Sequence, residues 1–456
     1  MPPHWSYELQ ADPGAHELVV NATFTGETDD ELTVEEGGEP FVRDVEVLGA
    51  SGSTRLEEKK RSWFMREPCR PTCTVRYRYR LLDAARANDD VAVARAVGDA
   101  IEAPPSTWLL RPARATPGTP FRFHVTTAPG DVFVTGVFPA KDSGSTPNPG
   151  PPNPGPPNPA TFEGKTDDFY QLTYAAFGRL RVRDLRGGRV QLALLPGPSE
   201  ADDTIAGWVE AAARTVEGFY GVQPASHLLV LARPTRGSSV GFGTTMGHSG
   251  AAIAIDVGVK STPSELTNDW ILVHEMVHTA LPDLEGPQHW LEEGLATYVE
   301  PLARRRAGIR TAEDVWAEWV DQMPNGLPQA GDRGLDATPT WGRTYWGGAL
   351  FCLLADVEIR RRTNNAHSLG DALRAVLAAG GSIAESWPIE RVLDIGDAAT
   401  GVPVLREQYS RMAHAPVPVD LPALWKSLGV SGAGRTVTFD DAAPLASVRR
   451  GITEAP

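Results

Sequence analysis

The spacing of apolar residues changes along this chain, from every second residue near the N-terminus to helical spacing further on. In the stretch TVRYRYRL, Val75, Tyr77 and Tyr79 fall on one face of an extended segment, and arginines fall on the other. The stretches HELVVNATFT, FRFHV and GRLRVRDL repeat this alternation. Alternation with period two over several short segments is typical of antiparallel strands that have one solvated face. We therefore expect an N-terminal antiparallel β-sandwich with the arginine stripe on its solvated face.

The pattern changes after about residue 197. EADDTIAGWVEAAARTVEGFYG has helical spacing, SHLLVLARP and GAAIAIDVG have the composition of strands, and residues 262–380 are mostly helical in pattern. Strands followed by helices predict an α+β, mainly helical domain. We therefore predict a multi-domain chain: a β domain at 1–196, a second domain at 197–416, and a tail of short β and α elements at 417–456. The proline-rich stretch at 146–160 predicts a solvated insertion in the β domain, because proline fixes φ and lacks an N–H donor.

Composition and charge exclude several classes of protein. The 456 residues are 41% apolar and 22% charged, as in soluble globular proteins. The longest apolar runs fall short of the roughly 20 residues of a membrane helix, so we expect no integral membrane segment. The net charge of -15 argues against nucleic acid as a partner. The start MPPHWSYELQ does not have the pattern of a secretory signal, and a trimmed N-terminus would look the same. The cytoplasmic, periplasmic and secreted alternatives therefore stay open, as does the oligomeric state.

Three cysteines are too few for a four-sulfur zinc site. Cys352 lies in an apolar, helix-like run and is expected to be a buried thiol. Cys69 and Cys73 are four residues apart in CRPTC. This spacing leaves two alternatives open, a local disulfide and two free thiols.

The motif HEMVH is the strongest chemical signal in the sequence. A capping box, in which Thr262 precedes Pro263 and Glu265, predicts the start of the helix that carries it. His274 and His278 are four residues apart, so both imidazoles project from one face of that helix and can reach one Zn²⁺. Glu275 is offset by about 100° of helical rotation and can act as a general base beside the metal.

A third ligand separates a metal site from two unrelated histidines. Glu293 is the preferred candidate, because a turn at Gly286 and Pro287 brings a second helix, ending at about Pro301, back across the first. Its carboxylate would leave a fourth position of the metal for water. Glu292 and His289 are the neighbouring alternatives. Glu300 is two helical turns after Glu293, where it could accept the free N–H of a ligand histidine.

The pattern W-x-x-E-G-x-A-x-Y-x-E after HEMVH resembles the gluzincin zinc peptidases. Its residues here are Trp290, Glu293, Gly294, Ala296, Tyr298 and Glu300. The resemblance is to the bacterial glycyl aminopeptidase family and, more distantly, to the aminopeptidase N group. It spans residues 7–430 and is strongest at 270–363. It implies an N-terminal β domain, a thermolysin-like catalytic domain, and a catalytic zinc, one per chain.

The same resemblance extends to GRTYWGGALFCLLADVEIRRRT, residues 342–363. In these families a tyrosine before a helix of small residues hydrogen-bonds the oxyanion, and Tyr345 holds that position. Two features depart from the family pattern. The glycine-rich stretch at 241–256 contains no glutamate to hold a substrate amine, and its one carboxylate is Asp256. Too few residues follow Pro416 for the C-terminal PDZ domain that glycyl aminopeptidases carry.

We therefore predict a zinc-dependent metallopeptidase that hydrolyses peptides or proteins, with aminopeptidase and endopeptidase action both left open. The alternative is a peptide-binding scaffold with a structural zinc and lapsed catalysis. We expect Glu275 and Tyr345 to be the catalytic residues, and the metal ligands to be His274, His278 and Glu293. Candidates for a strand that pairs with substrate are Gly247, His248, Ser249 and Gly250.

Overall fold

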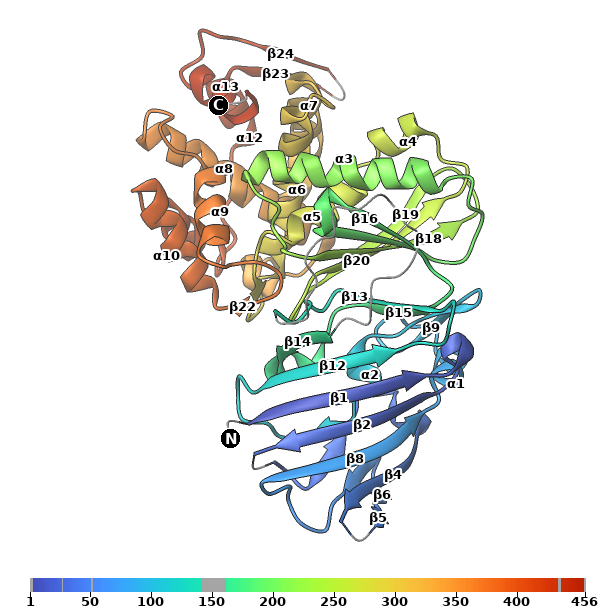
Figure 1. Ribbon diagram of the computed structural model, residues 1–456. Coiled ribbons are helices and arrows are strands. Elements are labelled where there is room, and N and C mark those ends of the chain that lie inside the picture. The colour runs from blue at the N-terminus through green and yellow to red at the C-terminus, as the bar shows by residue number, and fades with distance from the viewer. Residues whose placement is uncertain (1–2, 27, 51, 142–160, 434–435, 455–456) are drawn as a thin grey trace. The chain divides into compact units, whose positions relative to one another are not determined.

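The computed structural model describes residues 3–26, 28–50, 52–141, 161–433 and 436–454. Contacts within the chain divide it into two compact units. Unit 1 contains Met1–Ala206 and Ser226–Ser261, and unit 2 contains Gly207–Ala225 and Thr262–Pro456. Unit 1 is rich in strands and unit 2 in helices, which confirms a multi-domain chain with an N-terminal β-rich part (Figure 1).

The two units alternate along the chain. Residues 226–261 belong to unit 1 because their strands pair with strands of that unit. The predicted division into functional domains at 1–196, 197–416 and 417–456 stays a prediction. The predicted proline-rich insertion at 146–160 lies outside the described residues.

The largest sheet of unit 1 has its strands in the order β14-β12-β1-β2-β8-β4-β5. These are β14 (Thr161–Lys165), β12 (Pro120–Thr126), β1 (His4–Ala11), β2 (Leu18–Thr25), β8 (Thr72–Tyr79), β4 (Val42–Gly49) and β5 (Gly52–Arg55). All neighbours are antiparallel except β1 and β12. Val75, Tyr77 and Tyr79 of β8 are buried, as their alternation predicts. Arg76 and Arg78 face outward and pair with Glu46 and Glu17, so the arginine stripe is a solvated face.

Two smaller sheets and two short helices complete the N-terminal part of unit 1. One sheet has the order β13-β15-β10-β9, and the other has the order β11-β3-β7-β6. Their bounds are β13 (Val132–Thr135), β15 (Ala175–Gly178), β10 (Ala100–Glu102), β9 (Arg95–Val97), β11 (Arg111–Pro112), β3 (Glu31–Thr33), β7 (Ser62–Phe64) and β6 (Glu57–Lys59), and the helices are α1 (Leu81–Ala87) and α2 (Pro105–Trp108). Cys69 and Cys73 form a disulfide, which decides between the two alternatives that the spacing left open.

A mixed sheet of five strands closes unit 1, in the order β16-β17-β18-β20-β19. Its strands are β16 (Arg181–Leu185), β17 (Val190–Leu194), β18 (Leu228–Thr235), β20 (Ala252–Gly258) and β19 (Val240–Met246). The strands β17, β18 and β20 are parallel and almost wholly buried, which explains their continuous apolar sequences. Strand β19 pairs with β20 alone and forms one edge of this sheet.

Unit 2 is built of helices, with short two-stranded ladders between them (Figure 1). The helices are α3 (Asp202–Tyr220, which begins in unit 1), α4 (Pro263–Asn268), α5 (Ile271–His278), α6 (His289–Arg306), α7 (Ala312–Gln322), α8 (Gly348–Arg362), α9 (Leu369–Ala378), α10 (Ile389–Thr400), α11 (Val404–Met412), α12 (Leu421–Leu428) and α13 (Ala446–Thr453). The ladders are β21 (Asp283–Leu284) with β22 (Ser386–Trp387), and β23 (Val430–Ala433) with β24 (Thr436–Phe439). None of the helices in the described part of the chain is long and apolar enough to cross a membrane.

Candidate metal centre

The helical segment that leads into HEMVH starts at the predicted capping box. The Thr262 side chain accepts a hydrogen bond from Glu265 N at 3.2 Å, and Thr262 N donates to the Glu265 carboxylate at 2.8 Å. The box starts helix α4, and it satisfies backbone donors that the first turn of a helix leaves without partners.

The prediction of one continuous helix is wrong, because α4 and α5 are separate. Asp269 is extended, and its side chain accepts a hydrogen bond from Ile271 N at 2.8 Å. A carboxylate that accepts a hydrogen bond from the backbone two residues on offers that N–H an alternative to the helical hydrogen bond. The break also turns Trp270 outward. Its side chain is 51% exposed, although helical spacing from the buried Leu266 would have placed it on the same face.

Helix α6 carries the predicted third ligand. It begins at His289, after the predicted turn at Gly286 and Pro287, but it continues to Arg306 and does not end at Pro301. Arg304 holds the last turns, since it donates to the Glu300 carboxylate and to the backbone oxygens of Thr267 and Asn268. These tertiary contacts outweigh the cost of a proline within the helix.

The choice between Glu292 and Glu293 is decided by what each carboxylate contacts. Leu284 N donates to one oxygen of Glu292 at 2.8 Å, and the other oxygen lies 2.9 Å from Nδ1 of His289. Glu292 therefore ties the interhelical turn to the start of α6. Glu293 is rotated by about 100° around the same helix and faces α5. His289 also touches Glu293, at 3.5 Å, but its own side chain is 68% exposed.

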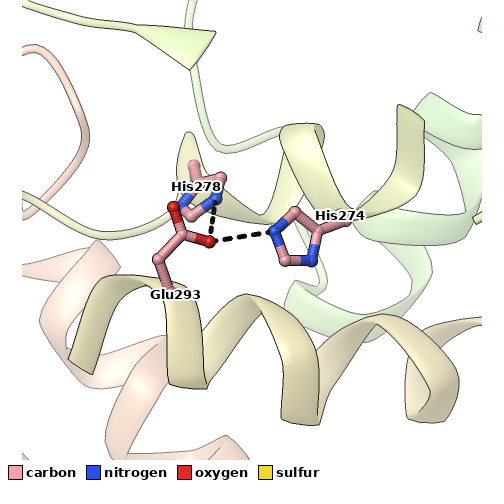
Figure 2. A group of neighbouring side chains, drawn as sticks. All are labelled: His274, His278 and Glu293. Atoms are coloured by element: carbon pink, nitrogen blue, oxygen red, sulfur yellow. Dashed lines mark hydrogen bonds and ion pairs between the residues drawn. The ribbon is translucent and has the colours of Figure 1, made fainter. Parts of the chain in front are cut away.

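His274, His278 and Glu293 converge (Figure 2). Glu293 Oε2 lies 3.2 Å from His274 Nε2 and 3.6 Å from His278 Nε2. Ligands about 2.0–2.1 Å from a tetrahedral Zn²⁺ lie roughly 3.3 Å from one another. The spacings therefore fit a divalent ion among these atoms. Two imidazoles and one carboxylate are also the donor set of a catalytic zinc site with an open fourth position.

The contacts within the cluster shift the pKa values of Glu293 and His278. Burial raises the pKa of the Glu293 carboxyl, but its bonds to His274 and His278 outweigh burial and hold the pKa well below its usual range. Burial lowers the pKa of His278, but its bond to Glu293 and the charges of Glu293, Glu275 and Glu292 together outweigh burial, so the net shift is upward. Glu293 is therefore ionised and ready to bind a cation.

Glu275 and Tyr345 both lie close to this cluster. Glu275 is buried on α5 and lies between the two histidines in sequence. Its charge raises the pKa values of His278 and Tyr345. Tyr345 lies in a π-helical turn, Gly342–Gly347, and its ring lies 6.3 Å from that of His274 at an interplanar angle of 24°. Burial, and then the charges of Glu293 and Glu275, raise the pKa of Tyr345 to about 12. The phenol therefore stays protonated at neutral pH and can donate a hydrogen bond.

Two glycines bring Tyr345 to this place. A Cβ on Gly294 of α6 would lie 2.3 Å from the Cα and the carbonyl carbon of Gly348, the first residue of α8. A Cβ on Gly348 would lie 2.0 Å from the backbone oxygen of Trp290. The two helices therefore cross backbone to backbone, which explains the glycine within α6. The crossing lies beside Glu293 on one helix and three residues after Tyr345 on the other.

The structure gives Glu300 a partner other than a ligand histidine. Its carboxylate accepts a hydrogen bond from Arg304 at 2.9 Å, and burial raises its pKa to about 7 in spite of that charge. The observed contact ties one turn of α6 to the next. Contact with a histidine stays a prediction.

The four candidates for a substrate strand belong to unit 1 and do not form a strand. Gly247, His248, Ser249 and Gly250 follow β19 as a turn, and His248 and Ser249 have positive φ. The two side chains are buried, and Ser249 Oγ accepts from Lys165 N at 3.0 Å. These contacts hold the turn within its own unit. A role for these four residues in binding substrate stays a prediction.

Sequence reasoning missed the residue that anchors the start of α6. The carboxylate of Asp336 accepts hydrogen bonds from Trp290 Nε1 at 2.8 Å, Gln288 Nε2 at 3.1 Å and Tyr409 OH at 2.9 Å. These partners are distant in sequence, so no local pattern could have identified Asp336. The two exposed tryptophans beside the cluster, Trp270 and Trp341, were also missed.

Comparison with known proteins shows that this chain is similar to solved structures in its fold. No sequence-family model matches the chain, and no curated protein matches it in sequence. The fold is similar to that of an aminopeptidase N family protein from Idiomarina loihiensis, with a TM-score of 0.67 and 14% identity, over 93% of this chain and 78% of that one.

An M1 zinc metallopeptidase from Deinococcus radiodurans is similar with a TM-score of 0.55 and 16% identity, over 91% of this chain and 94% of that one. A mutant of the Deinococcus enzyme bound to a Tyr-Ser-Ala substrate matches with the same TM-score and 15% identity, over 91% of this chain and 94% of that one. The expected resemblance to zinc aminopeptidases is therefore confirmed at the level of fold: this chain is folded like the M1 zinc metallopeptidases.

Proposed function

We propose that this protein is a zinc-dependent metallopeptidase with one catalytic zinc per chain. The observation that carries the proposal is the convergence of His274, His278 and Glu293 at ligand spacing on two neighbouring helices. An ordinary pair of helices has no need of two imidazoles and an ionised carboxylate buried together. Similarity to zinc metallopeptidases in fold, and the HExxH pattern on α5, support the same conclusion.

The residues around the proposed zinc supply acid–base and electrostatic catalysis. When bound, Zn²⁺ supplies Lewis-acid chemistry, by which it acidifies water and polarises a carbonyl oxygen. Glu275 accepts the proton of the attacking water and passes it to the leaving amine. Tyr345 donates a hydrogen bond to the oxyanion, since its raised pKa keeps the phenol protonated.

A peptide or protein is the proposed substrate. The Deinococcus relative in fold binds a tripeptide substrate, which supports this class. The stretch 241–256 contains no glutamate that could hold a substrate amine. Aminopeptidase-like and endopeptidase action are therefore both compatible with this site, and the products of cleavage distinguish them.

The test is digestion of a peptide library by the wild type and by Glu275→Gln, with the termini of the products sequenced and zinc measured by mass spectrometry. We expect cleavage by the wild type to fall about 10²–10⁴-fold in the variant, with zinc retained. Glu285→Gln is the matched control, because Glu285 is an exposed carboxylate in the segment between the same two helices. Equal cleavage by wild type and Glu275→Gln would refute the mechanism. Bound zinc without cleavage by the wild type would favour the peptide-binding scaffold.

A further inference from the structure

Ten of the twelve tryptophans of this protein are buried, and two are not. The exceptions are Trp270, which is 51% exposed, and Trp341, which is 62% exposed. A fold that buries an indole at every other opportunity gives up favourable free energy at these two positions. Exposed large apolar side chains that gather at one place mark a surface that binds something.

Both exposed indoles lie beside the candidate metal centre. Each is four residues before a residue of the centre, Trp270 before His274 and Trp341 before Tyr345. The centroid of the Trp270 ring is 5.3 Å from that of His274, and the centroid of Trp341 is 6.3 Å from that of Tyr345. The ring centroids of His274 and Tyr345 are 6.3 Å apart. The four rings therefore form a continuous row, with an exposed indole at each end and the ligand and the phenol between them.

The local structure turns these indoles outward. In one continuous helix, Trp270 would lie on the apolar stripe with Leu266 and Val273, which are both buried. The break at Asp269 takes it off that stripe. Trp341 lies at the start of the π-helical turn, a rare geometry that is frequent at functional sites. Two separate irregularities of the backbone thus expose one indole each at the same centre.

The chemistry around the row favours apolar side chains over cationic ones as the occupants. An indole face attracts both. Among the neighbouring carboxylates, Glu293 contacts the two histidines, and its side chain is only 12% exposed. A large apolar side chain would cover the exposed indole area, whereas a cationic head group keeps its contact with water.

We propose that Trp270 and Trp341 are binding platforms for large apolar or aromatic side chains of the substrate, one beside the ligand His274 and the other beside the catalytic Tyr345. The protein would then prefer peptides with such residues next to the cleaved bond. This proposal rests on the proposed peptidase function and adds the substrate class. Each indole is expected to contribute roughly two- to tenfold in affinity, as aromatic pairs do.

The first test measures binding without turnover. Iodide, a collisional quencher, reaches the two exposed indoles of zinc-loaded Glu275→Gln and leaves the ten buried ones unquenched. We expect tripeptides that contain Phe or Leu to protect the emission from iodide, and equal tripeptides with Ser or Lys to protect it much less. Protection by the Ser peptides equal to that by the Phe peptides would overturn the proposal. Stronger protection by the Lys peptides would also overturn it, in favour of a cationic occupant.

The second test uses variants in the full-length protein. Trp270→Ala and Trp341→Ala should each weaken binding of the Phe tripeptide roughly two- to tenfold, and Trp→Phe at either position should restore most of it. Val222→Ser is the matched control, since Val222 is an exposed apolar side chain of unit 2 outside the proposed site. A zinc content equal to that of the wild type verifies that each variant is folded, and the Phe variants give the same test if an Ala variant is not.

Unchanged affinity in both Ala variants would overturn the proposal. Cleavage by the wild type without side-chain preference would also refute it, and the peptidase function would stand. Selective protection by Phe peptides without any cleavage would refute the peptidase function and leave the apolar binding surface supported.

Discussion

The contact between Gly294 and Gly348 gives the sharpest prediction about stability. In Gly294→Ala, the new Cβ would lie 2.3 Å from two backbone carbons of Gly348 and 2.8 Å from Ala349 N. Carbon atoms in ordinary contact are about 3.5–4.0 Å apart, so α6 and α8 must separate by more than about 1 Å. Backbone atoms cannot move aside as a flexible side chain can. Overpacking of this kind costs about 1–3 kcal/mol, and the better helix propensity of alanine offsets about 1 kcal/mol of it.

The matched control is Gly207→Ala in α3. Gly207 also lies within a helix of unit 2, and a Cβ there meets nothing within 4 Å. This variant should therefore gain up to about 1 kcal/mol from helix propensity alone. Urea unfolding in the presence of a chelator measures both variants without the contribution of bound zinc. We expect Gly294→Ala to be less stable than the wild type and Gly207→Ala to be at least as stable.

The same substitution should also reach the metal centre. Gly294 follows Glu293 directly, so a helix displaced by about 1 Å moves the proposed carboxylate ligand. Zinc affinity, measured by competition with a chromophoric chelator, should fall in Gly294→Ala and stay unchanged in Gly207→Ala. If Gly294→Ala proves as stable as Gly207→Ala and binds zinc equally well, the close crossing is not what positions the site.

Two further predictions concern single side chains. Tyr345→Phe should lower kcat/KM about 10²–10³-fold with zinc content unchanged, because it removes the proposed donor to the oxyanion; a wild-type rate would exclude that role. Burial outweighs the charge of Arg95 and raises the pKa of Glu102, on β10, to about 7. Because the folded state then holds this proton more tightly than the unfolded state, stability should fall as pH rises from about 4.5 to about 7. Urea unfolding across this pH range should show that the free energy of unfolding falls less in Glu102→Gln than in the wild type. If it falls equally in both proteins, the raised pKa of Glu102 is contradicted.

Local patterns predicted a large part of both the fold and the centre. The alternation in β8 predicted which side chains are buried, and the capping box at Thr262 predicted where α4 begins. The interval of four residues predicted that His274 and His278 share one face of a helix. These features succeed because each depends on the geometry of one strand or one helical turn, which neighbouring residues determine.

The predictions that failed, or left alternatives open, concern a local hydrogen bond of Asp269, distant contacts of Arg304 and a disulfide between cysteines four residues apart. The break before Trp270 and the continuation of α6 beyond Pro301 go against the local pattern, and tertiary hydrogen bonds of Arg304 hold the end of α6. The sequence also left open whether Cys69 and Cys73 are free thiols or a disulfide, and in the structure they form a disulfide.

By itself the sequence determined two imidazoles on one helical face, a carboxylate between them, and a second helix rich in acidic residues. The tertiary structure alone places Glu293, and not Glu292, against the imidazoles of His278 and His274, which lie 15 and 19 residues earlier. It also decided that a contact between two glycines brings Tyr345 beside them, and that two indoles face solvent there. The physical reason is that spacing along a helix follows from the geometry of one turn, whereas convergence of distant segments depends on which backbones can approach closely.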